Sequence, residues 1–495
     1  MVADAPQIFA FDNTYARELD GCYAPVTPAT VPAPELVQLN RALAAELGFD
    51  AAGLDPARAA AVFAGNLLPA GATPIAQAYA GHQFGGFVPQ LGDGRAVLLG
   101  EVVDRHGRRR DIAFKGSGRT PFSRGGDGKA AIGPVLREYV IGEAMHALGI
   151  PTTRALAAVR TGEEIWRDRP VPGAVLTRVA ASHLRVGTFQ FFAARGAHDT
   201  VRALADYVIA RHDPDLAGDP DRYFGLFQRV AARQAALIAR WMLVGFIHGV
   251  MNTDNMTLSG ETIDYGPCAF MESYDPATVF SSIDAQGRYA YENQPLIARW
   301  NLARFAETLL PLIDPASTAQ AVERAMAVID DFPGRYGAAW LDGARGKLGL
   351  AGSDDGDQAL ADDWLALLAA QRVDFTLAWR QLGEAAAGDD APLAALFAES
   401  AALTSWLARW RPRAERDGRA GAERRAAMQR ANPLYIPRNH RVEEALAAAE
   451  HGDLTPFERL LEAVTRPFDP RPGLERYAEP APRDVTARYK TFCGT

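Results

Sequence analysis

One segment of the chain carries more information than any other: His248-Gly-Val-Met-Asn-Thr-Asp-Asn-Met-Thr-Leu-Ser-Gly-Glu-Thr-Ile-Asp-Tyr-Gly266. It places an acid beside an amide at Asp254 and Asn255, and a second acid at Asp264. Between them we expect a short hairpin with strands 256–258 and 262–263 and a turn at 259–261. A divalent cation that bridges phosphate groups needs oxygen ligands from two segments held at a fixed separation. Asn255 and Asp264 could supply those ligands.

The same order of parts occurs in protein kinases, where a catalytic loop ending in Asn is followed by a hairpin and an Asp-Phe-Gly triplet. One kinase feature is missing, because Val250 occupies the position of the usual catalytic base. Asp254 is the best remaining acid for removing a proton. Its alternatives are a further carboxylate in the metal shell or a helix cap. His248 has no second His or Cys at ligand spacing, so we expect it to brace the loop through hydrogen bonds.

Composition and charge narrow the class of protein. The chain has 495 residues, a formal net charge of −8 and a pI near 5.7, which argues against a general nucleic-acid binder. Its three cysteines are too few for a disulfide scaffold and favour a reducing compartment. The N-terminus lacks a signal-peptide pattern, and the most apolar segment, 235–248, is too short to span a bilayer. We therefore expect a cytoplasmic protein that needs no membrane and acts as a monomer.

The hydrophobic pattern changes along the chain. Leucines at helical spacing predict a helix over 34–48, and a second short helix is expected over 57–64. Strands are expected at 96–103, 111–115, 153–159 and 174–179, with a helix at about 132–148 between the two pairs. Beyond 188 the pattern is almost wholly helical. The sequence thus predicts an α+β protein with a mixed sheet first and a helical part after it.

Lys115 and Glu138 form the first candidate pair outside the central segment. Lys115 ends a predicted strand, where kinases keep the lysine that grips the nucleotide phosphates, and Glu138 lies in the following helix. A buried lysine needs a counter-ion, which Glu138 would supply. The alternative is a solvent-exposed lysine with an unrelated surface glutamate.

Glycine-rich segments surround these residues. Gly92 and Gly94 could let backbone amides approach phosphate oxygens, although two glycines are also a common turn. The loop over 116–129 combines glycines with Arg119, Arg124 and Lys129, so it can present backbone donors and positive charge, or it can be a long flexible surface loop. Asp127 could bind a ribose hydroxyl, an adenine amine or a backbone turn. Arg178 and Arg185 suggest a clamp on phosphate oxygens, or surface salt bridges.

These motifs resemble the selenoprotein O family, kinase-like proteins that act as protein adenylyltransferases. The resemblance covers nearly the whole chain and is carried by several motifs in the same order: Pro89–Arg95, Phe114–Gly128, His248–Met256, Asp264–Pro267, Asn432–His440 and Cys493–Thr495. It implies a two-lobed kinase-like fold with N- and C-terminal extensions. The divisions that we expect are 1–85 (arm and helices), 86–187 (N-lobe), 188–430 (helical C-lobe) and 431–495 (C-terminal extension).

The resemblance also implies an activity, the transfer of AMP from ATP to Ser, Thr or Tyr hydroxyls of proteins with release of pyrophosphate. UMP transfer from UTP stays open. The nucleotide would lie flipped relative to kinases, so that the α-phosphate faces the acceptor and the outer phosphates are buried among cations. Two other classes remain: a kinase-like phosphotransferase and a non-catalytic nucleotide-binding scaffold.

Mapped by matching motif, the resemblance assigns a role to each candidate residue. Asp254 would be the general base, Asn255 and Asp264 would bind Mg²⁺ or Mn²⁺, and Glu138 would orient Lys115. Asp264 would also line the nucleotide site. The other residues of that site would be Gly92, Gly94, Arg95, Lys115, Asp127, Gly128, Arg178 and Arg185. Family members with selenocysteine near the C-terminus suggest redox control, and our hypothesis is a disulfide between Cys268 and Cys493; the alternative is two unpaired cysteines.

Overall fold

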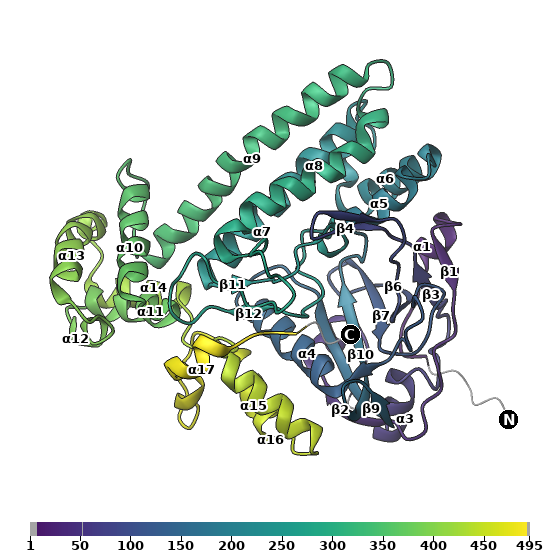
Figure 1. Cartoon of the computed structure of the whole chain (residues 1–495), viewed down its shortest axis with the longest axis horizontal. Coiled ribbons are helices and arrows are strands. Elements are labelled where there is room, and N and C mark those ends of the chain that lie inside the picture. Colours follow the sequence, from purple (N-terminus) through teal and green to yellow (C-terminus); the bar gives the residue numbers. More distant parts are fainter. Residues whose placement is uncertain (1–6, 52, 493–495) are drawn as a thin grey trace.

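A computed structural model describes residues 7–51 and 53–492 and has a mixed α+β architecture (Figure 1). An antiparallel sheet comes from the first part of the chain, and helices make up most of the remainder. The strands are β1 (Tyr23–Pro25), β2 (Glu35–Leu39), β3 (Ile75–Gln77), β4 (Gly81–Gln83), β5 (Gly86–Val88), β6 (Ala96–Val103), β7 (Arg109–Lys115), β8 (Ala130–Ala131), β9 (Arg154–Trp166), β10 (Pro170–Ala180), β11 (Phe246–Ile247) and β12 (Ala269–Phe270).

The large sheet has the order β1-β3-β6-β7-β10-β9-β2, and β8 pairs with β10. Every pairing between its named strands in the described residues is antiparallel, so the expectation of a mixed sheet is corrected. Consecutive strands such as β6–β7 and β9–β10 are joined by short connections, which suit antiparallel pairing and leave no room for a crossover helix. β4 and β5 form a separate two-stranded hairpin.

The side chains on the two faces of the sheet belong to two separate hydrophobic cores. On β7, Ile112 and Phe114 pack in one core with the helix α3 (Pro56–Phe63), while Ala113 belongs to the core of the helix α4 (Ile132–Ala147). Successive side chains of a strand point to opposite faces, so Lys115 emerges on the same face as Ala113. Leu176 on β10 belongs to the same core as Ala113, which puts Arg178 on that face as well. The sheet therefore directs both cations toward α4.

The helical part begins after β10. Its helices, together with the shorter ones before the sheet, are α1 (Thr14–Glu18), α2 (Arg41–Glu46), α5 (Val186–Ala193), α6 (His198–His212), α7 (Arg222–Val244), α8 (Gln294–Ile313), α9 (Thr318–Lys347), α10 (Asp357–Gln371), α11 (Phe375–Ala386), α12 (Ala391–Ala394), α13 (Ser400–Ala414), α14 (Gly421–Ala431), α15 (Asn439–Glu450), α16 (Thr455–Val464) and α17 (Arg483–Arg488).

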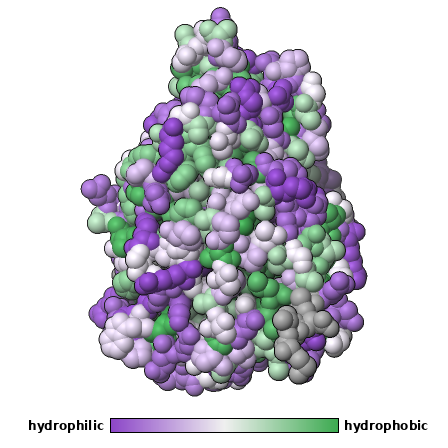
Figure 2. Space-filling model, turned by 90° about the vertical axis from the view of Figure 1, so that its right-hand side faces the viewer, coloured by the Kyte–Doolittle hydropathy of each residue, from purple (hydrophilic) through white to green (hydrophobic). Residues whose placement is uncertain are grey.

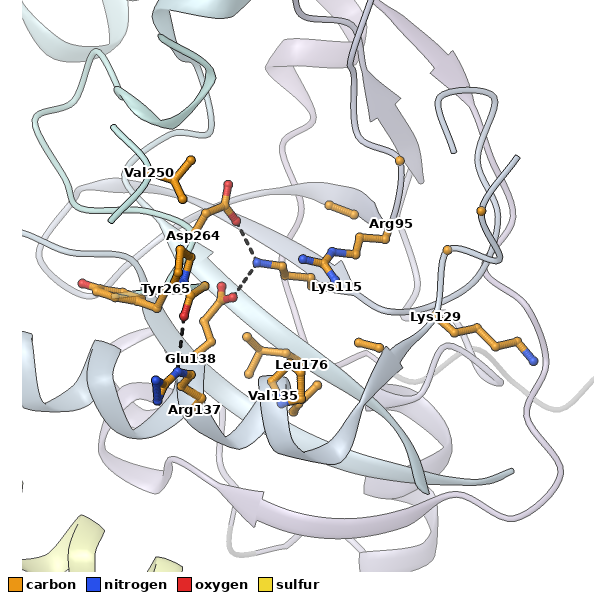
Figure 3. A pocket seen from close by; sticks show the side chains of 18 of the residues that line it. Arg95, Lys115, Lys129, Val135, Arg137, Glu138, Leu176, Val250, Asp264 and Tyr265 are labelled. Atoms are coloured by element: carbon orange, nitrogen blue, oxygen red, sulfur yellow. Dashed lines mark hydrogen bonds and ion pairs between the residues drawn. The ribbon is translucent and has the colours of Figure 1, made fainter. Parts of the chain in front are cut away.

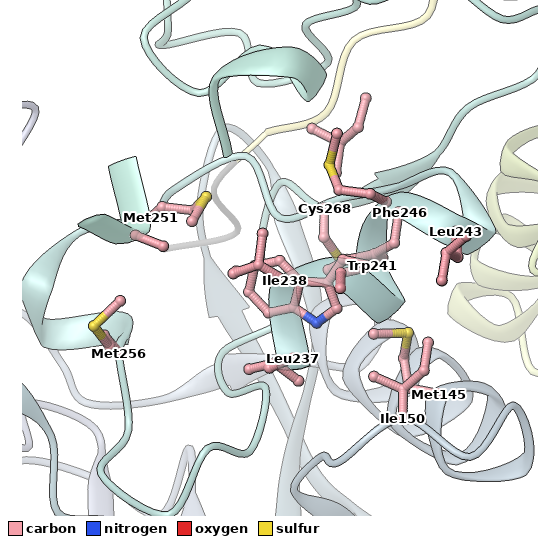
Figure 4. Packing of buried hydrophobic residues seen from close by; sticks show 14 of the residues in the cluster. Met145, Ile150, Leu237, Ile238, Trp241, Leu243, Phe246, Met251, Met256 and Cys268 are labelled. Carbon is pink, nitrogen blue, oxygen red and sulfur yellow. The ribbon is translucent and has the colours of Figure 1, made fainter. Parts of the chain in front are cut away.

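Helix α7 leads directly into the segment with the candidate acids. It packs against α8 and α9, and it ends at Gly245, whose φ of 72° suits a left-handed C-cap. The strand β11 follows and pairs with β12, which lies beyond Asp264. In Figure 4, Trp241 from α7 packs close to Phe246, Met251 and Cys268. This apolar cluster fixes both ends of the loop that carries Asp254 and Asp264.

The C-terminal helices return to the sheet. α15 and α16 both pack on α4, which is buried along most of its length between them and the sheet (Figure 1). Tyr139 of α4 meets Phe457 of α16 edge to face at 5.9 Å. The last described residues, up to 492, then run back toward the segment after Asp264. Segments from both ends of the chain thus enclose α4.

Two expectations about local structure are wrong. The segment 34–48 is not one helix: β2 pairs with β9, and α2 begins after Asn40, whose side chain accepts a hydrogen bond from the backbone N–H of Leu43. Helical leucine spacing was overridden by the open edge of β9. The expected helix over 57–64 is confirmed by α3. The strands expected at 96–103 and 111–115 and the helix at 132–148 are confirmed with small changes of boundary. The strands expected at 153–159 and 174–179 are present but longer, because β9 continues to Trp166 and β10 begins at Pro170.

The expected hairpin after Asn255 is the second error. Thr257 forms a bridge with Arg185 and Thr262 forms one with Thr152, so the two short segments pair outward with other parts of the chain. The turn between them is closed by a side chain, because the hydroxyl of Thr257 donates to the carbonyl of Glu261 at 2.6 Å. The loop is therefore fastened to the sheet side of the molecule.

Hydrophobic and hydrophilic residues intermingle on the face shown in Figure 2, where apolar residues occur in scattered patches. Within the described residues, no helix is both long and apolar enough to cross a membrane.

Candidate active site

A cavity of about 1030 Å³ lies where the sheet, α4 and the segment after α7 meet, and all the candidate nucleotide and metal residues line it. Lys115 is at its centre (Figure 3). Its ammonium donates to Glu138 Oε2 at 2.5 Å and to Asp264 Oδ1 at 2.8 Å. All three side chains are largely buried. The predicted Lys115–Glu138 pair is therefore present, and Asp264 joins it from a segment 149 residues away.

Two arginines complete this cluster. Arg178 Nη1 lies 2.7 Å from Asp264 Oδ1 and 3.2 Å from Glu138 Oε1. Arg185 Nη1 lies 3.2 Å from Asp264 Oδ2 and donates to the backbone carbonyl of Asp254 at 3.0 Å. Both guanidinium groups are buried, which excludes the alternative of surface salt bridges. The side chains of three cations and two acids thus meet in one place.

Electrostatics keep Asp264 ionised. Burial by itself would raise the pKa of this carboxyl, but Lys115, Arg178 and Arg185 outweigh it and hold the pKa well below its usual range. Asp264 also has a φ of 61°, in the left-handed region that non-glycine residues rarely adopt. A strained backbone and a carboxylate shared by three cations are typical of a functional position.

The glycines of the two loops are required by close packing. A Cβ at Gly92 would lie 2.3 Å from the ring of Phe122, and one at Gly128 would lie 2.1 Å from the carbonyl oxygen of Gly118. At Gly94 a Cβ would come within 2.9 Å of the carbonyl oxygen of Phe122. A larger residue would have to displace the Phe122 side chain at Gly92 and backbone at Gly94 and Gly128, so the glycines let the loops close over the cavity.

Arg95 and Asp127 also line the cavity. Asp127 accepts a hydrogen bond from the backbone N–H of Lys129 at 2.9 Å and pairs with Arg167 at 2.9 Å. Of its three predicted roles, this geometry supports the backbone turn. Burial opposes its ionisation, but Arg167 and the Lys129 amide lower its pKa overall.

Asp254 and Asn255 stand on the opposite wall of the cavity, in a short 3₁₀ turn over Thr253–Asn255. Burial raises the pKa of Asp254 to about 6. Its Oδ2 accepts from Gln83 Nε2 at 3.3 Å, while Oδ1 is buried without a hydrogen-bond partner among the described residues. The amide nitrogen of Asn255 donates to Val250 O at 2.9 Å, which leaves its oxygen as the atom that can bind a cation.

His248 braces the loop, as predicted. Its Nε2 lies 2.9 Å from the carbonyl oxygen of Ile263, directly before Asp264, and its ring stacks on Trp241 at 5.5 Å. The described residues contain no group of three His, Cys, Asp or Glu side chains that could hold a metal ion.

Comparison with known proteins identifies the family. A family model described as protein adenylyltransferase SelO matches residues 8–465. The chain belongs to the SelO family. It is 64% identical to the protein nucleotidyltransferase YdiU of Chromobacterium violaceum, over 96% of this chain and 99% of that protein. It is 62% identical to the protein of the same name from Cereibacter sphaeroides, over 98% of this chain and 100% of that protein.

Membership in the SelO family makes the chain a protein nucleotidyltransferase, with ATP as the substrate that supplies an adenylyl group. The cavity is large enough for a nucleotide, it is rich in buried cations on the sheet side, and it carries a carboxylate with a raised pKa on the other side.

Several residues of this SelO-family cavity were not found from the sequence. Gln83 contacts Asp254 although 171 residues separate them. Lys490, Thr491 and Phe492, near the end of the chain, also line the cavity. None of these lies in a motif with recognisable chemistry, and each reaches the cavity only through long-range packing.

Of the two cysteines in the hypothesised disulfide, the structure describes Cys268 and not Cys493. Cys268 is fully buried beside the cavity, and burial raises the pKa of its thiol to about 12. Cys493 lies outside the described residues. The hydroxyl of Thr491 donates to the carbonyl of Pro267 at 2.6 Å, so the chain just before Cys493 runs beside the residue that precedes Cys268.

Proposed function

We propose that the chain transfers AMP from ATP to Ser, Thr or Tyr hydroxyls of protein substrates and releases pyrophosphate. One observation carries the proposal: Lys115 from the sheet and Asp264 from the helical part meet at 2.8 Å in the wall of a nucleotide-sized cavity. A cation that can hold phosphates and a carboxylate that can hold a divalent metal are two groups that such a reaction requires at the phosphates of the donor.

The proposal includes the architecture around the cavity. The antiparallel sheet with α4 would correspond to the N-lobe of a kinase-like fold, and α5 to α14 to its C-lobe. The Lys115–Glu138 pair between a strand and the next helix supports this assignment. The divisions near 85, 187 and 430 stay predictions. Strands β1, β2 and β3 come from the first 85 residues and belong to the same sheet, so that segment and the proposed N-lobe fold together.

The residues present fit a divalent cation such as Mg²⁺ or Mn²⁺. Asn255 offers an amide oxygen and Asp264 a carboxylate, both facing the cavity, and these are the hard oxygen donors that such ions prefer. Mg²⁺ is usually held by one or two protein ligands together with phosphates, which suits a site without a larger acidic cluster in the described part of the chain. The ion would neutralise charge on the donor phosphates.

The buried cations favour the flipped nucleotide that AMP transfer needs. Lys115, Arg178 and Arg185 lie deep in the cavity, where they can hold the outer phosphates and stabilise pyrophosphate as it leaves. The α-phosphate would then face Asp254. The acceptor oxygen forms a bond to the α-phosphorus while the bond from that phosphorus to the bridging oxygen breaks. The hydroxyl proton passes to Asp254, whose raised pKa near 6 makes it a usable base near neutral pH.

Labelled ATP tests the proposal directly. The protein is incubated with an acceptor protein mixture and ATP labelled on either the α- or the γ-phosphate, with Mg²⁺ or Mn²⁺ in parallel. Retention of label on protein only from α-labelled ATP is the expected result. Retention only from γ-labelled ATP would show a kinase instead, and no retention from either would leave a nucleotide-binding scaffold. The same assay with α-labelled UTP decides whether UMP is transferred.

A further inference from the structure

The hairpin formed by β4 and β5 lies beside Asp254 and has no role in the chemistry described above. Gln83 of β4 contacts the Asp254 carboxylate at 3.3 Å, and a Cβ at Gly81 would come within 2.4 Å of Asp254 Oδ1. The backbone N–H of His82 donates to Thr253 Oγ1 at 2.7 Å, and that of Phe84 donates to Asn252 Oδ1 at 3.1 Å. The hairpin is therefore fastened to the loop that carries the proposed base.

The outer side of this hairpin is apolar and partly exposed. Phe84 is 38% exposed and Phe87 is 41% exposed. Phe84 holds a positive φ of 52° at the turn, and its ring packs on Tyr289 at 5.1 Å. The ring of His82 lies 4.9 Å from Phe87 and 5.2 Å from Trp300 of α8. These rings form one aromatic surface next to the cavity.

A guanidinium group lies at the edge of the aromatic surface. Arg288 sits 4.8 Å from the ring centroid of Trp300, and its Cζ would be 3.6 Å from a Cβ at Gly85 in the hairpin turn. Its Nε has no hydrogen-bond partner, and no carboxylate within the described part of the chain pairs with its guanidinium. The nearby Asp284 is occupied by the backbone N–H groups of Arg288 and Tyr289. Among the described residues, the guanidinium of Arg288 thus faces the rings of Trp300 and Tyr289 and no carboxylate partner.

We propose that the β4–β5 hairpin, Trp300 and Arg288 form the docking surface for the acceptor protein, and that the surface selects a segment with a carboxylate side chain near the modified hydroxyl. We call these residues the acceptor surface. The proposal rests on the proposed function, because an acceptor hydroxyl must come to Asp254, and the acceptor surface adjoins that residue. A partly buried arginine without a carboxylate partner complements an acidic side chain, and exposed phenylalanines complement an apolar neighbour.

A peptide library with one central Ser, Thr or Tyr and randomised flanking positions tests the acceptor surface. The library is incubated with α-labelled ATP, and the modified peptides are isolated and sequenced. We expect Asp and Glu to be enriched at a fixed distance from the modified residue. Arg288→Gln should abolish that enrichment and lower kcat/KM for an acidic peptide about tenfold, mainly through KM, since a charged hydrogen bond is lost. The KM for ATP should stay unchanged.

Charge reversal gives the sharper result. Arg288→Glu should replace the preference for Asp and Glu by one for Lys and Arg at the same position. Arg299→Gln is the matched control, because Arg299 lies one residue from Trp300 on α8 but already pairs with Asp330 at 2.6 Å. Its flanking preference should equal that of the unaltered protein. Thermal unfolding of all three variants shows whether each is folded.

Two outcomes would overturn the acceptor surface. The first is an identical flanking preference in the unaltered protein and in Arg288→Glu. The second is whole proteins that accept α-label while no library peptide does, because the surface is proposed to bind short segments. Neither touches the proposed function, which fails only if no protein at all retains label from α-labelled ATP.

Discussion

Asp264 is the residue on which the opposing charges of the site converge. Its two carboxylate oxygens are shared by Lys115, which is largely buried, and by the buried Arg178 and Arg185, so its negative charge is needed even before any substrate binds. Removing one partner of a buried ionic group is costly because it leaves the other charges uncompensated. Asp264 therefore has a structural and a chemical role, and a test has to separate them.

The substitution Asp264→Asn makes that separation, because it keeps the shape of the side chain and removes the charge. We expect transfer of label from α-labelled ATP to fall at least about a hundredfold, as when a group that stabilises transition-state charge is lost. Thermal unfolding should show a folded protein with lowered stability. A folded variant with normal transfer would contradict the assignment of Asp264 to metal binding. Glu138→Gln provides the reference for stability alone, because it shows how far thermal unfolding shifts when one buried acid of the same cluster loses its charge.

Asp254 should behave differently, because no cation of the described residues pairs with its carboxylate, and its side-chain hydrogen bond comes from the neutral amide of Gln83. Asp254→Asn should leave ATP binding, measured by calorimetry, nearly unchanged. It should lower kcat by about a hundredfold or more, the usual contribution of a positioned general base. A loss of ATP affinity with an unchanged kcat would point instead to a role in binding the nucleotide.

At the scale of residues, local motifs predicted the acids and cations but not how they are combined. Lys115 and Glu138 could be paired in advance because protein kinases keep such a lysine on a strand and its glutamate on the following helix. Whether Arg178 and Arg185 were buried could not be decided, because spacing does not reveal which side of a strand end is covered. Gln83 could not be predicted from the sequence, since its contact with Asp254 depends on how a separate hairpin packs on the loop.

The loop over 116–129 contains glycines at two kinds of position: one where a side chain would have space and one where it would clash. Gly125 and Gly128 both have positive φ, at 87° and 68°. A Cβ at Gly125 would meet nothing within 4 Å, whereas one at Gly128 would collide with the carbonyl of Gly118. The loop therefore provides its own control for backbone strain.

Gly128→Ala should displace the loop and raise the KM for ATP about tenfold or more, since small misplacements of binding groups are costly. Gly125→Ala carries only the strain of a left-handed alanine, of about 1–2 kcal/mol, and should leave that KM nearly unchanged. Steady-state kinetics with α-labelled ATP checks both. Equal effects of the two substitutions would mean that strain, and not the clash, controls the loop.

The elements that the sequence predicted poorly are those whose partners are remote. The leucines over 34–48 have helical spacing, yet β2 forms because β9 offers an open edge. The segments at 256–258 and 262–263 were expected to pair with each other, but each finds a partner in a different part of the chain. In contrast, β6, β7 and α4 are encoded by contacts close in sequence, so their periodicity was sufficient.

One buried lysine of the described residues lies far along the chain from the candidate active-site motifs and does not line the cavity. Lys347, at the end of α9, is buried, and its ammonium lies 5.0 Å from the ring of Trp379. Burial lowers its pKa from 10.5 to about 7. The unfolded chain binds this proton up to about pH 10.4, so between pH 7 and that value the unfolded state binds more protons than the folded state. The contribution of Lys347 to stability therefore becomes more favourable as pH rises through this window.

Lys347→Met should stabilise the molecule, because it removes a buried charge at similar volume. We expect the free energy of unfolding at pH 7 to increase by about 1–3 kcal/mol. The difference between variant and unaltered protein should shrink as pH is raised toward 10. Urea unfolding at several pH values measures it. A difference that does not change with pH would mean that Lys347 is not protonated differently in the two states.

The end of the chain connects parts of the molecule that are far apart in sequence. The hydroxyl of Tyr489 accepts from Arg137 of α4 at 3.0 Å, and Thr491 is held by the carbonyl of Pro267. Two further residues lead from Thr491 to Cys493, a distance of about 7 Å when extended. Cys268 follows Pro267 directly, and a disulfide requires Cα atoms about 4.4–6.8 Å apart. Because Cys493 lies outside the described residues, the Cys268–Cys493 disulfide stays a prediction.

We predict that mild oxidation links Cys268 to Cys493 and slows AMP transfer, because the tail would be fixed against the cavity that Lys490 to Phe492 line. Mass mapping of oxidised protein should find the linked peptide, and reduction should restore activity. Cys22→Ser is the control that should keep both effects, since Cys22 is buried among residues around β1. Cys493→Ser should lose them.

The buried Cys268 thiol, with its pKa near 12, is a poor nucleophile, so the reaction should begin with oxidation of Cys493 and should proceed faster at higher pH. Oxidised protein without a Cys268–Cys493 peptide would remove the idea.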